Sequence, residues 1–331
     1  MSTMKNTTVR AGMLALPLLA RAAFAAEPPP AEPLPPTTVP TPDQAAAPVT
    51  EAPPAPVKPP APPYSLPWQL RPAAAANVVR SDTSSGMRSV NGNGGSTVVT
   101  LLLASYKVMP DLAVLVRGGL VSDSPPVGTE GSAFLNPVLG ATYAVQLGSG
   151  FRLAPFLGLA LPLGNGGGNT PDPAVRTALG AGILTRASMD NAMFAVNYLT
   201  PFPGVGLAWV YKGLTVQAEL TLLELFRVRG ELVDKDAART NFTSGLHVGY
   251  FFIPELSAGA ELRYQRWLKN PGIPESDPRR DTASAAIGIR AHFKLSDTMW
   301  LRPGAAYVQA LDGPMTDQSY RIAQLDVPFA F

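Results

Sequence analysis

Two histidines, His247 and His292, are the only imidazole side chains in this 331-residue chain. An imidazole that works with a serine and a carboxylate can hydrolyse an ester, and at a lipid substrate it must face the lipid. Both histidines lie in stretches that alternate with period two, and both share the parity of the polar members. We therefore expect both to face an interior, and we predict no catalytic residue.

The sequence gives equally little support for a metal or cofactor site. The two histidines have no expected carboxylate on the same face, which makes a poor metal site. Gly164–Gly168 is glycine-rich but lacks the lysine of a phosphate-binding loop. The chain contains no Cys, which excludes disulfides, thiolate metal sites and a Cys nucleophile. We predict no metal and no cofactor.

Charged side chains on the polar parity form a second group of candidates, expected to line an enclosed interior. Seven are cationic and three are anionic, so that interior would be mildly basic. A ring of arginines biases a pore toward anions. The alternative is that the charges pair across neighbouring strands and only hold the wall. The residues are Arg117, Arg152, Arg263, Arg290, Lys294, Arg302 and Arg321, with Glu219, Glu261 and Asp326.

The composition limits the partners and divides the chain. Lys and Arg total 26 against 24 Asp and Glu, a net charge of +2 that argues against a nucleic-acid partner. Mean hydropathy is +0.11, too low for a polytopic helical membrane protein. Of the 36 prolines, 16 lie in 28–63, whereas 29 of the 30 glycines lie at residue 86 or later. The chain therefore divides into a Pro-rich N-terminal part and a Gly-containing part of different physical character.

The N-terminal part is read as a leader and a spacer. Residues 1–25 combine a positive start, an apolar stretch and the A-x-A sequence Ala23-Phe24-Ala25, which predicts a secretory signal peptide. Residues 26–68 are rich in Pro and Ala and have no hydrophobic period, which predicts a disordered periplasmic spacer. At about 3.1 Å per residue, the 28–63 segment could reach roughly 110 Å.

From residue 69 onward, apolar and polar residues alternate, most clearly in Leu256–Tyr264. A period of two indicates strands with one apolar face. That face meets a second sheet in a soluble β-sandwich, and lipid in an outer-membrane barrel. The segments are longer than sandwich strands of about 5 to 6 residues and suit a tilted bilayer crossing. We therefore predict a transmembrane antiparallel β-barrel over 69–331, with the sandwich as the alternative.

Aromatic residues and loop lengths agree with a barrel. Short connections alternate with long ones, and the long ones include 81–96, 122–132 and 163–175. Short periplasmic turns and longer outer loops are typical of this architecture. Aromatics on the apolar parity gather near strand ends, as the membrane interface favours. They are Tyr143, Tyr211, Tyr250, Phe252 and Phe293 at one level, and Tyr264 and Tyr307 at the other.

The pattern predicts about fourteen strands. The segment 176–187 also fits helical spacing, so a loop helix or lumen plug is its alternative. If it and 190–199 leave the wall, the barrel has twelve strands. The predicted strands are 70–80, 97–109, 112–121, 133–147, 151–162, 176–187, 190–199, 205–211, 214–228, 240–252, 256–268, 281–294, 299–311 and 319–331.

The C-terminal residues carry the most specific pattern. Leu325, Val327, Phe329 and Phe331 alternate with other residues, and Phe331 is the last. This resembles the terminal strand of Gram-negative outer-membrane β-barrel proteins, of the porin-like channel and transporter class, over roughly residues 70–331. The resemblance implies an outer-membrane location, contact with outer-membrane lipid and recognition of the four residues by the barrel-assembly machinery.

We therefore expect an outer-membrane channel or passive transporter for small solutes with a narrow, mildly basic lumen. Twelve to fourteen strands lie between filled eight-stranded barrels and open ones of sixteen or more. The spacer or the 163–189 region could partly occlude the lumen. The alternative is a structural or anchoring barrel whose 28–63 segment binds peptidoglycan or a periplasmic protein.

Overall fold

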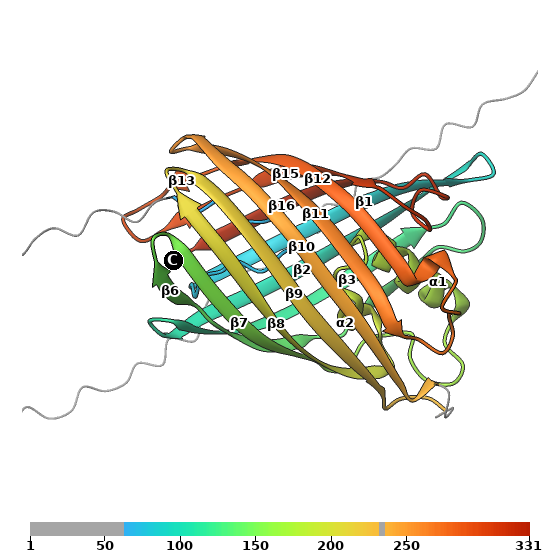
Figure 1. Cartoon of the computed structure of the whole chain (residues 1–331). Helices are drawn as coiled ribbons and strands as arrows, with labels where there is room; N and C mark the ends of the chain where they lie inside the picture. Colours follow the sequence, from blue (N-terminus) through green and yellow to red (C-terminus); the bar gives the residue numbers. More distant parts are fainter. Residues whose placement is uncertain (1–62, 232–235) are drawn as a thin grey trace, which may run out of the picture. The chain divides into compact units, whose positions relative to one another are not determined.

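A closed antiparallel β-barrel dominates the computed structural model, which describes residues 63–231 and 236–331 (Figure 1). The barrel closes where β1 pairs with β16, and its wall has twelve strands, as the alternative count predicted. The predicted signal peptide and nearly all of the predicted spacer lie outside the described residues. The wall strands are β1 (Val78–Val90), β2 (Asn93–Met109), β3 (Leu112–Ser124), β5 (Val138–Tyr143), β7 (Phe151–Ala160), β8 (Tyr198–Tyr211), β9 (Leu214–Arg227), β10 (Ala238–Ile253), β11 (Leu256–Lys269), β12 (Asp281–Ala291), β15 (Gly304–Ala310) and β16 (Arg321–Ala330).

Short strands extend this wall at its irregular places. β4 (Gly131–Phe134) pairs with β3 and β6 (Val145–Gly148) pairs with β7, on either side of β5 along the chain. β13 (Phe293–Lys294) and β14 (Trp300–Leu301) lengthen the connection between β12 and β15. The pairing therefore leaves no unpaired edge at the seam, which is how barrels satisfy their backbone groups in lipid.

The outer surface of the wall is apolar. Side chains such as Leu262, Ile287 and Leu325 are 53%, 66% and 54% exposed, while their sequence neighbours Glu261 and Asp326 are buried inside. A soluble protein of this pattern would bury the apolar side. The arrangement instead matches a lipid-facing exterior and a polar interior.

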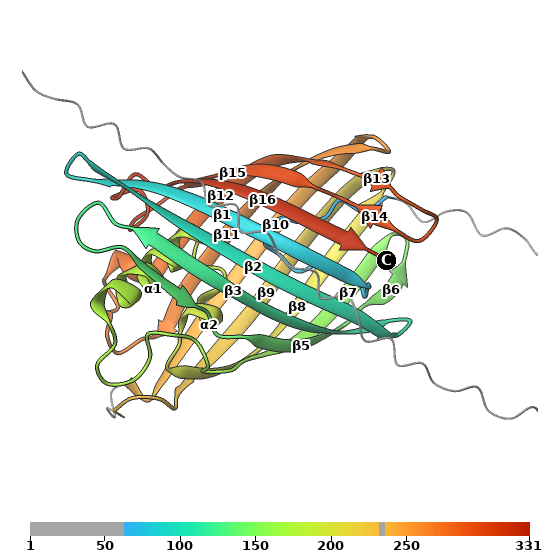
Figure 2. The same cartoon turned by 180° about the vertical axis from the view of Figure 1, so that it is seen from behind.

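Two rims differ in their connections. Tight turns such as Ser149-Gly150 and Lys212-Gly213, with positive φ at all four residues, lie at the end that carries the C-terminus. We call this end the short-turn rim. The opposite end, the long-loop rim, carries the longer connections and helix α1 (Pro173–Thr185), as Figure 2 shows. Short turns of this kind are typically periplasmic.

The predicted aromatic girdle is present at the short-turn rim. The predicted residues Tyr143, Tyr211, Tyr250, Phe252 and Phe293 are between 47% and 62% exposed. They are joined by aromatic pairs that suit a membrane interface, where a ring contacts both lipid and water. The pairs, with centroid distances, are Phe151–Trp209 (6.3 Å), Trp209–Tyr211 (5.6 Å), Tyr250–Phe252 (5.5 Å) and Phe329–Phe331 (6.0 Å).

The first strand differs from the prediction. The segment 70–80 is not a wall strand over most of its length, and 81–96 is not a long loop, because β1 and β2 form a tight hairpin there. Its turn residues Asn91 and Gly92 have φ of 51° and 80°, the pair that a type I′ turn requires. β1 lacked a clear apolar alternation because serines and a threonine occupy much of both its faces.

The 176–187 segment is helical, as its alternative stated, and 190–199 contributes only its end to the wall. α1 begins at Pro173, and the Asp172 carboxylate caps it by accepting from Ala174 N at 2.8 Å. α2 (Asn191–Phe194) follows, and β8 begins at Tyr198. A short 3₁₀ turn, η2 (Pro278–Arg280), precedes β12.

Across the described ranges, no helix is both long and apolar enough to span a membrane.

Candidate functional site

The residues before β1 occupy the barrel interior. Residues 63–77, here called the inner segment, form no helix or strand, yet Trp68, Leu70 and Ala73 are almost fully buried. A buried irregular backbone needs partners for its N–H and C=O groups. The wall supplies these partners from side chains that project into the lumen.

Two glutamates of the wall hold the backbone of the inner segment. Glu261 accepts hydrogen bonds from Trp68 N through Oε1 and from Gln69 N through Oε2, the latter at 3.2 Å. Glu219 accepts from Arg71 N and from Arg71 Nη1, both at 2.5 Å. Both carboxylates were predicted to line the lumen. Their charge is therefore used within the protein and is not offered to a solute.

Glycines of the wall make room for the same segment. A Cβ at Gly304 would lie 2.7 Å from the Trp68 ring, and one at Gly288 would lie 2.6 Å from it. At Gly245, the three atoms nearest to an added Cβ all belong to Leu70. The segment is therefore fitted into a groove in the wall, and Arg290 closes over Trp68 with its Cζ 4.5 Å from the ring centroid.

An ion-pair cluster attaches α1 and α2 to the wall. Arg186, fully buried after the end of α1, donates to both carboxylate oxygens of Asp82 at 2.8 and 2.7 Å. Asp190 accepts from Arg186 Nε at 2.8 Å and from Arg117 Nη1 at 2.5 Å. Each buried charge thus has an opposite charge beside it, as burial demands.

A second cluster lies beneath the inner segment. Asp326 accepts from Arg80 Nε at 2.6 Å and from Arg290 Nη2 at 2.5 Å. Glu261 accepts from Arg263 Nε at 2.9 Å. Asp326 and Glu261 thus pair across or along strands, the kind of pair that the alternative interpretation expected, whereas Glu219 pairs with the inner segment and Arg117 with Asp190.

The structure separates the predicted lumen residues into three groups. Arg117, Glu219, Glu261, Arg263, Arg290 and Asp326 face the interior and are paired there. Arg152 and Arg302 face the interior near the short-turn rim. Arg321 is exposed on the outer face, because it shares the parity of Ala323 and Leu325, so its placement in the lumen was wrong. Lys294 is also exposed, at 2.7 Å from Asp297.

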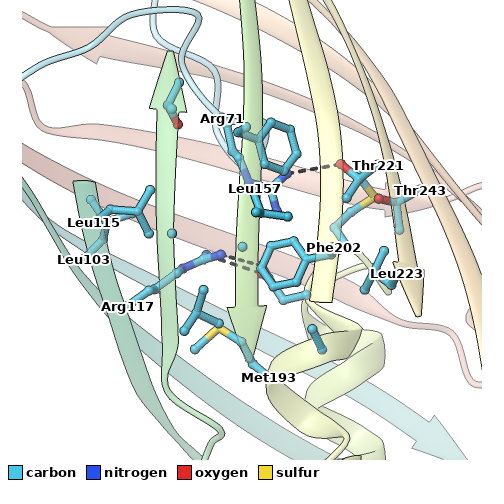
Figure 3. A pocket seen from close by; sticks show the side chains of 18 of the residues that line it. Arg71, Leu103, Leu115, Arg117, Leu157, Met193, Phe202, Thr221, Leu223 and Thr243 are labelled. Carbon is cyan, nitrogen blue, oxygen red and sulfur yellow. Dashed lines mark hydrogen bonds and ion pairs between the residues drawn. The ribbon is translucent and has the colours of Figure 1, made fainter. Parts of the chain in front are cut away.

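Three cavities follow one another along the interior. The largest, here called the vestibule, opens at the short-turn rim and has a volume of about 1030 Å³. It shares Arg71, Leu103, Leu115 and Thr142 with a much smaller cavity, the neck, of about 60 Å³. Figure 3 shows Arg71, Arg117 and Phe202 around the neck. Helix α2 borders the neck through Ala192 and Met193.

The outer cavity, of about 430 Å³, lies on the other side of α2, at the long-loop rim. Phe194 and Trp267 line it together with Asp236, which accepts from Tyr198 OH at 2.7 Å. Burial alone would raise the pKa of Asp236, but hydrogen bonds from Tyr198 and Arg239 outweigh burial and lower that pKa. Among the described residues, the vestibule and neck thus lie on one side of α2 and the outer cavity on the other.

The vestibule is cationic. Among the described residues that line it, five carry a positive charge and none is Asp or Glu. Arg71 and Arg80 are paired with Glu219 and Asp326. Arg152 and Arg302 form no ion pair with any described residue, and their guanidinium groups lie over Tyr64 and Trp300 at 5.1 and 5.3 Å. The fifth cation is Lys212, in the turn between β8 and β9.

Both histidines face the interior, as predicted, but one has a carboxylate beside it, contrary to expectation. His247 Nδ1 lies 3.6 Å from Glu261 Oε1, and its Nε2 lies 3.3 Å from Ser65 Oγ. The order serine, histidine, carboxylate resembles a hydrolytic triad, yet Ser65 is 2% exposed and lines none of the three cavities. Glu261 is already bonded to two amides and Arg263. This cluster holds the inner segment.

No protein-family model matches the chain, and no curated protein matches it. Among solved structures, an outer-membrane channel from Pseudomonas putida F1 is similar at 13% identity and a TM-score of 0.50, over 80% of this chain and 98% of that one. The KdgM porin is similar at 11% identity and 0.43, over 76% and 99%. The NanC porin is similar at 10% identity and 0.44, over 76% and 98%.

These likenesses concern the fold. The closed wall with an apolar exterior and a polar interior has the architecture of an outer-membrane β-barrel, and the fold likeness to the Pseudomonas putida F1 channel agrees with it.

Several residues of the site escaped the sequence prediction. Trp68, Arg71 and Arg186 carry much of the interior architecture, but they lie outside the wall. Arg80 and Asp82 were missed because β1 was displaced by several residues. One signal was present: Tyr64, Leu66, Trp68 and Leu70 alternate at the end of a Pro- and Ala-rich stretch that otherwise has only scattered apolar residues and no aromatic one.

Proposed function

We propose that this barrel is a passive channel for small solutes with a preference for anions. The vestibule supports this proposal most directly, since its described lining carries five cations and no carboxylate. Interior glutamates and aspartates are engaged in ion pairs, so they do not offset the charge of Arg152 and Arg302. Fixed cations near a pore mouth raise the local anion concentration and favour anion passage.

The neck limits the rate at which solutes pass through the barrel. A cavity of about 60 Å³ holds little more than one or two water molecules, so solute passage requires the inner segment or α2 to move. We therefore expect a small or intermittent conductance rather than the steady current of a wide porin. The inner segment is the smaller obstacle, because among the described residues it has one ion pair to the wall, Arg71 with Glu219, whereas a cluster of buried ion pairs around Arg186 and Asp190 holds the helices.

Reversal-potential measurement in a planar bilayer under a KCl gradient tests the proposal. We expect anion selectivity that decreases in the Arg152→Ala/Arg302→Ala double variant. The control for each single variant, Arg152→Ala and Arg302→Ala, is Arg321→Ala, which removes one positive charge from the outer face. A cation-selective or silent channel would overturn the proposal, as would an equal effect of the control variant.

The second candidate is a structural or anchoring barrel, and the filled interior favours it. The inner segment, through Arg71, and α2, through Ala192 and Met193, border the neck, the smallest of the three cavities. The 28–63 segment, of which only Pro63 is described, would then bind peptidoglycan or a periplasmic protein. Liposome swelling distinguishes the two: solute flux supports the channel, and its absence with retained envelope binding supports the anchor.

A further inference from the structure

We propose that the vestibule is a binding site for amphipathic organic anions, that is, molecules with one carboxylate or similar group on an apolar body. This inference deepens the proposed channel function and rests on it for the route of the ligand. It is argued from the two unpaired guanidinium groups, the apolar residues between them and the position of the neck.

Arg152 and Arg302 provide the recognition of charge. Both line the vestibule without an ion-pair partner among the described residues, and Arg302 Nε is buried with no acceptor. In the wall order β7, β8, β9, β10, β11, β12 and β15, Arg152 belongs to the first strand and Arg302 lies just before the last. Half of the twelve-strand circumference separates them, so they stand on opposite walls. A guanidinium offers bidentate bonds to a carboxylate.

The surface between the two arginines is apolar. Leu66, Leu103, Leu115, Phe251 and Trp300 line the vestibule. A small hydrated anion gains nothing from these contacts, whereas an apolar body removes its own surface and theirs from water. Specific sites of this kind combine a largely apolar wall with a few placed polar groups.

Each arginine has an aromatic ring beside it, which brings the two kinds of contact together. Arg152 Cζ lies 5.1 Å from the centroid of Tyr64, and Arg302 Cζ lies 5.3 Å from that of Trp300. A ligand whose carboxylate meets either guanidinium therefore places its neighbouring carbons against an aromatic face. A hydrophilic anion would contact the guanidinium group but gain nothing from the aromatic ring beside it.

The neck explains why the ligand would stop in the vestibule. The space falls from about 1030 Å³ to about 60 Å³ where Arg71, Leu103 and Leu115 belong to both cavities. Tyr64, Leu66, Arg71 and Pro72 of the inner segment form one side of the vestibule, so a bound ligand contacts the element that narrows the lumen. A ligand at this site is thus held in the vestibule, next to the neck.

Calorimetric titration of the full-length protein in lipid nanodiscs tests the site, with empty nanodiscs as the blank. The probes are octanoate, acetate, which keeps only the charge, and 1-octanol, which keeps only the apolar body. We expect saturable binding of octanoate and at least about tenfold weaker binding of the other two. Equal affinity for octanoate and 1-octanol, or for octanoate and acetate, would overturn the proposal.

The arginine variants locate the site. Because a charge-assisted hydrogen bond contributes more than a neutral one, the Arg152→Ala/Arg302→Ala variant should bind octanoate about ten- to a hundredfold more weakly. Arg321→Ala should bind as the unmodified protein does. An unchanged affinity in a double variant that still shows heat-resistant folded barrel on gels would refute the site. Binding without conductance would refute the channel and leave the site standing.

Discussion

The backbone amide of Trp68 donates a hydrogen bond to the Glu261 carboxylate across 193 positions of the chain. The segment before the first strand is thereby fixed to β11, in the far part of the wall. Because Glu261 also accepts from Gln69 N and Arg263 Nε, a single carboxylate joins the inner segment to the ion-pair network. The lumen of this barrel is therefore narrowed by the inner segment, residues 63–77, which precedes the first strand.

Replacing Trp68 by Ala should release the inner segment. A buried Trp that is truncated to Ala loses about 3–5 kcal/mol of packing, and here the loss falls on an element held by few other large side chains. We expect a higher single-channel conductance and faster proteolysis near residue 68. Trp209→Ala, in the lipid-facing girdle, is the control and should change neither. An unaltered conductance in Trp68→Ala would argue against occlusion by this segment.

A Gly245→Ala substitution tests the same contact from the wall. The nearest atoms to the added methyl group all belong to Leu70, so the wall itself needs no rearrangement. We expect Leu70 to be displaced and conductance to rise. Gly206→Ala is the matched control, since its nearest neighbour would be 3.8 Å away. If both variants conduct equally, the fit between Leu70 and Gly245 does not limit the lumen.

Asp82→Asn should weaken the barrel. The substitution leaves Arg186, which is buried, and Arg117 with a single carboxylate, Asp190, between them. Breaking a buried pair in this way costs about 3–5 kcal/mol. The midpoint of urea unfolding in detergent should fall markedly. Asp297→Asn removes an exposed pair to Lys294 and should cost less than about 1 kcal/mol. Equal midpoints for the two variants would contradict the ranking.

Phe331→Ser should lower the amount of folded barrel in the outer membrane severalfold. Phe331 is exposed and stacks with Phe329 at 6.0 Å, so it is accessible to an assembly factor. Refolding of the purified variant into detergent should proceed normally, because the side chain contributes little to the interior. Phe293→Ser, at the same rim, should assemble at the normal level. A defect that also appears in purified refolding would indicate lost stability rather than lost recognition.

The wall was largely predictable, whereas the filling of the lumen was not. Strands such as β9 and β11 have period-two alternation because each faces lipid on one side and polar side chains on the other. β1 was misplaced because its faces carry Ser and Thr, although Asn91-Gly92 marked its turn. The alternating pattern alone was enough to predict that Arg152 and Arg302 face the interior.

Pairing could not be predicted in the same way. The partners of Arg186 and Glu261 lie 104 and 193 positions away, at Asp82 and Trp68. Such distances are set by closure of the barrel, and no local pattern encodes them. Trp68 carried only a weak signal, since four alternating apolar residues read as the beginning of a wall strand. Arg321 was misassigned although its own parity placed it with the outward residues.

The two arms of the inner segment lie side by side, because Ala73 N donates to Tyr64 OH at 2.9 Å, and both Tyr64 and Ala76 line the vestibule. Both ends of the inner segment therefore lie at the vestibule. A pulling force on the chain upstream of residue 63 would load the contacts of Tyr64, Ser65 and Trp68 one after another. Contacts loaded in sequence yield at lower force than contacts loaded together, so we expect such a force to detach the segment before it disrupts the wall.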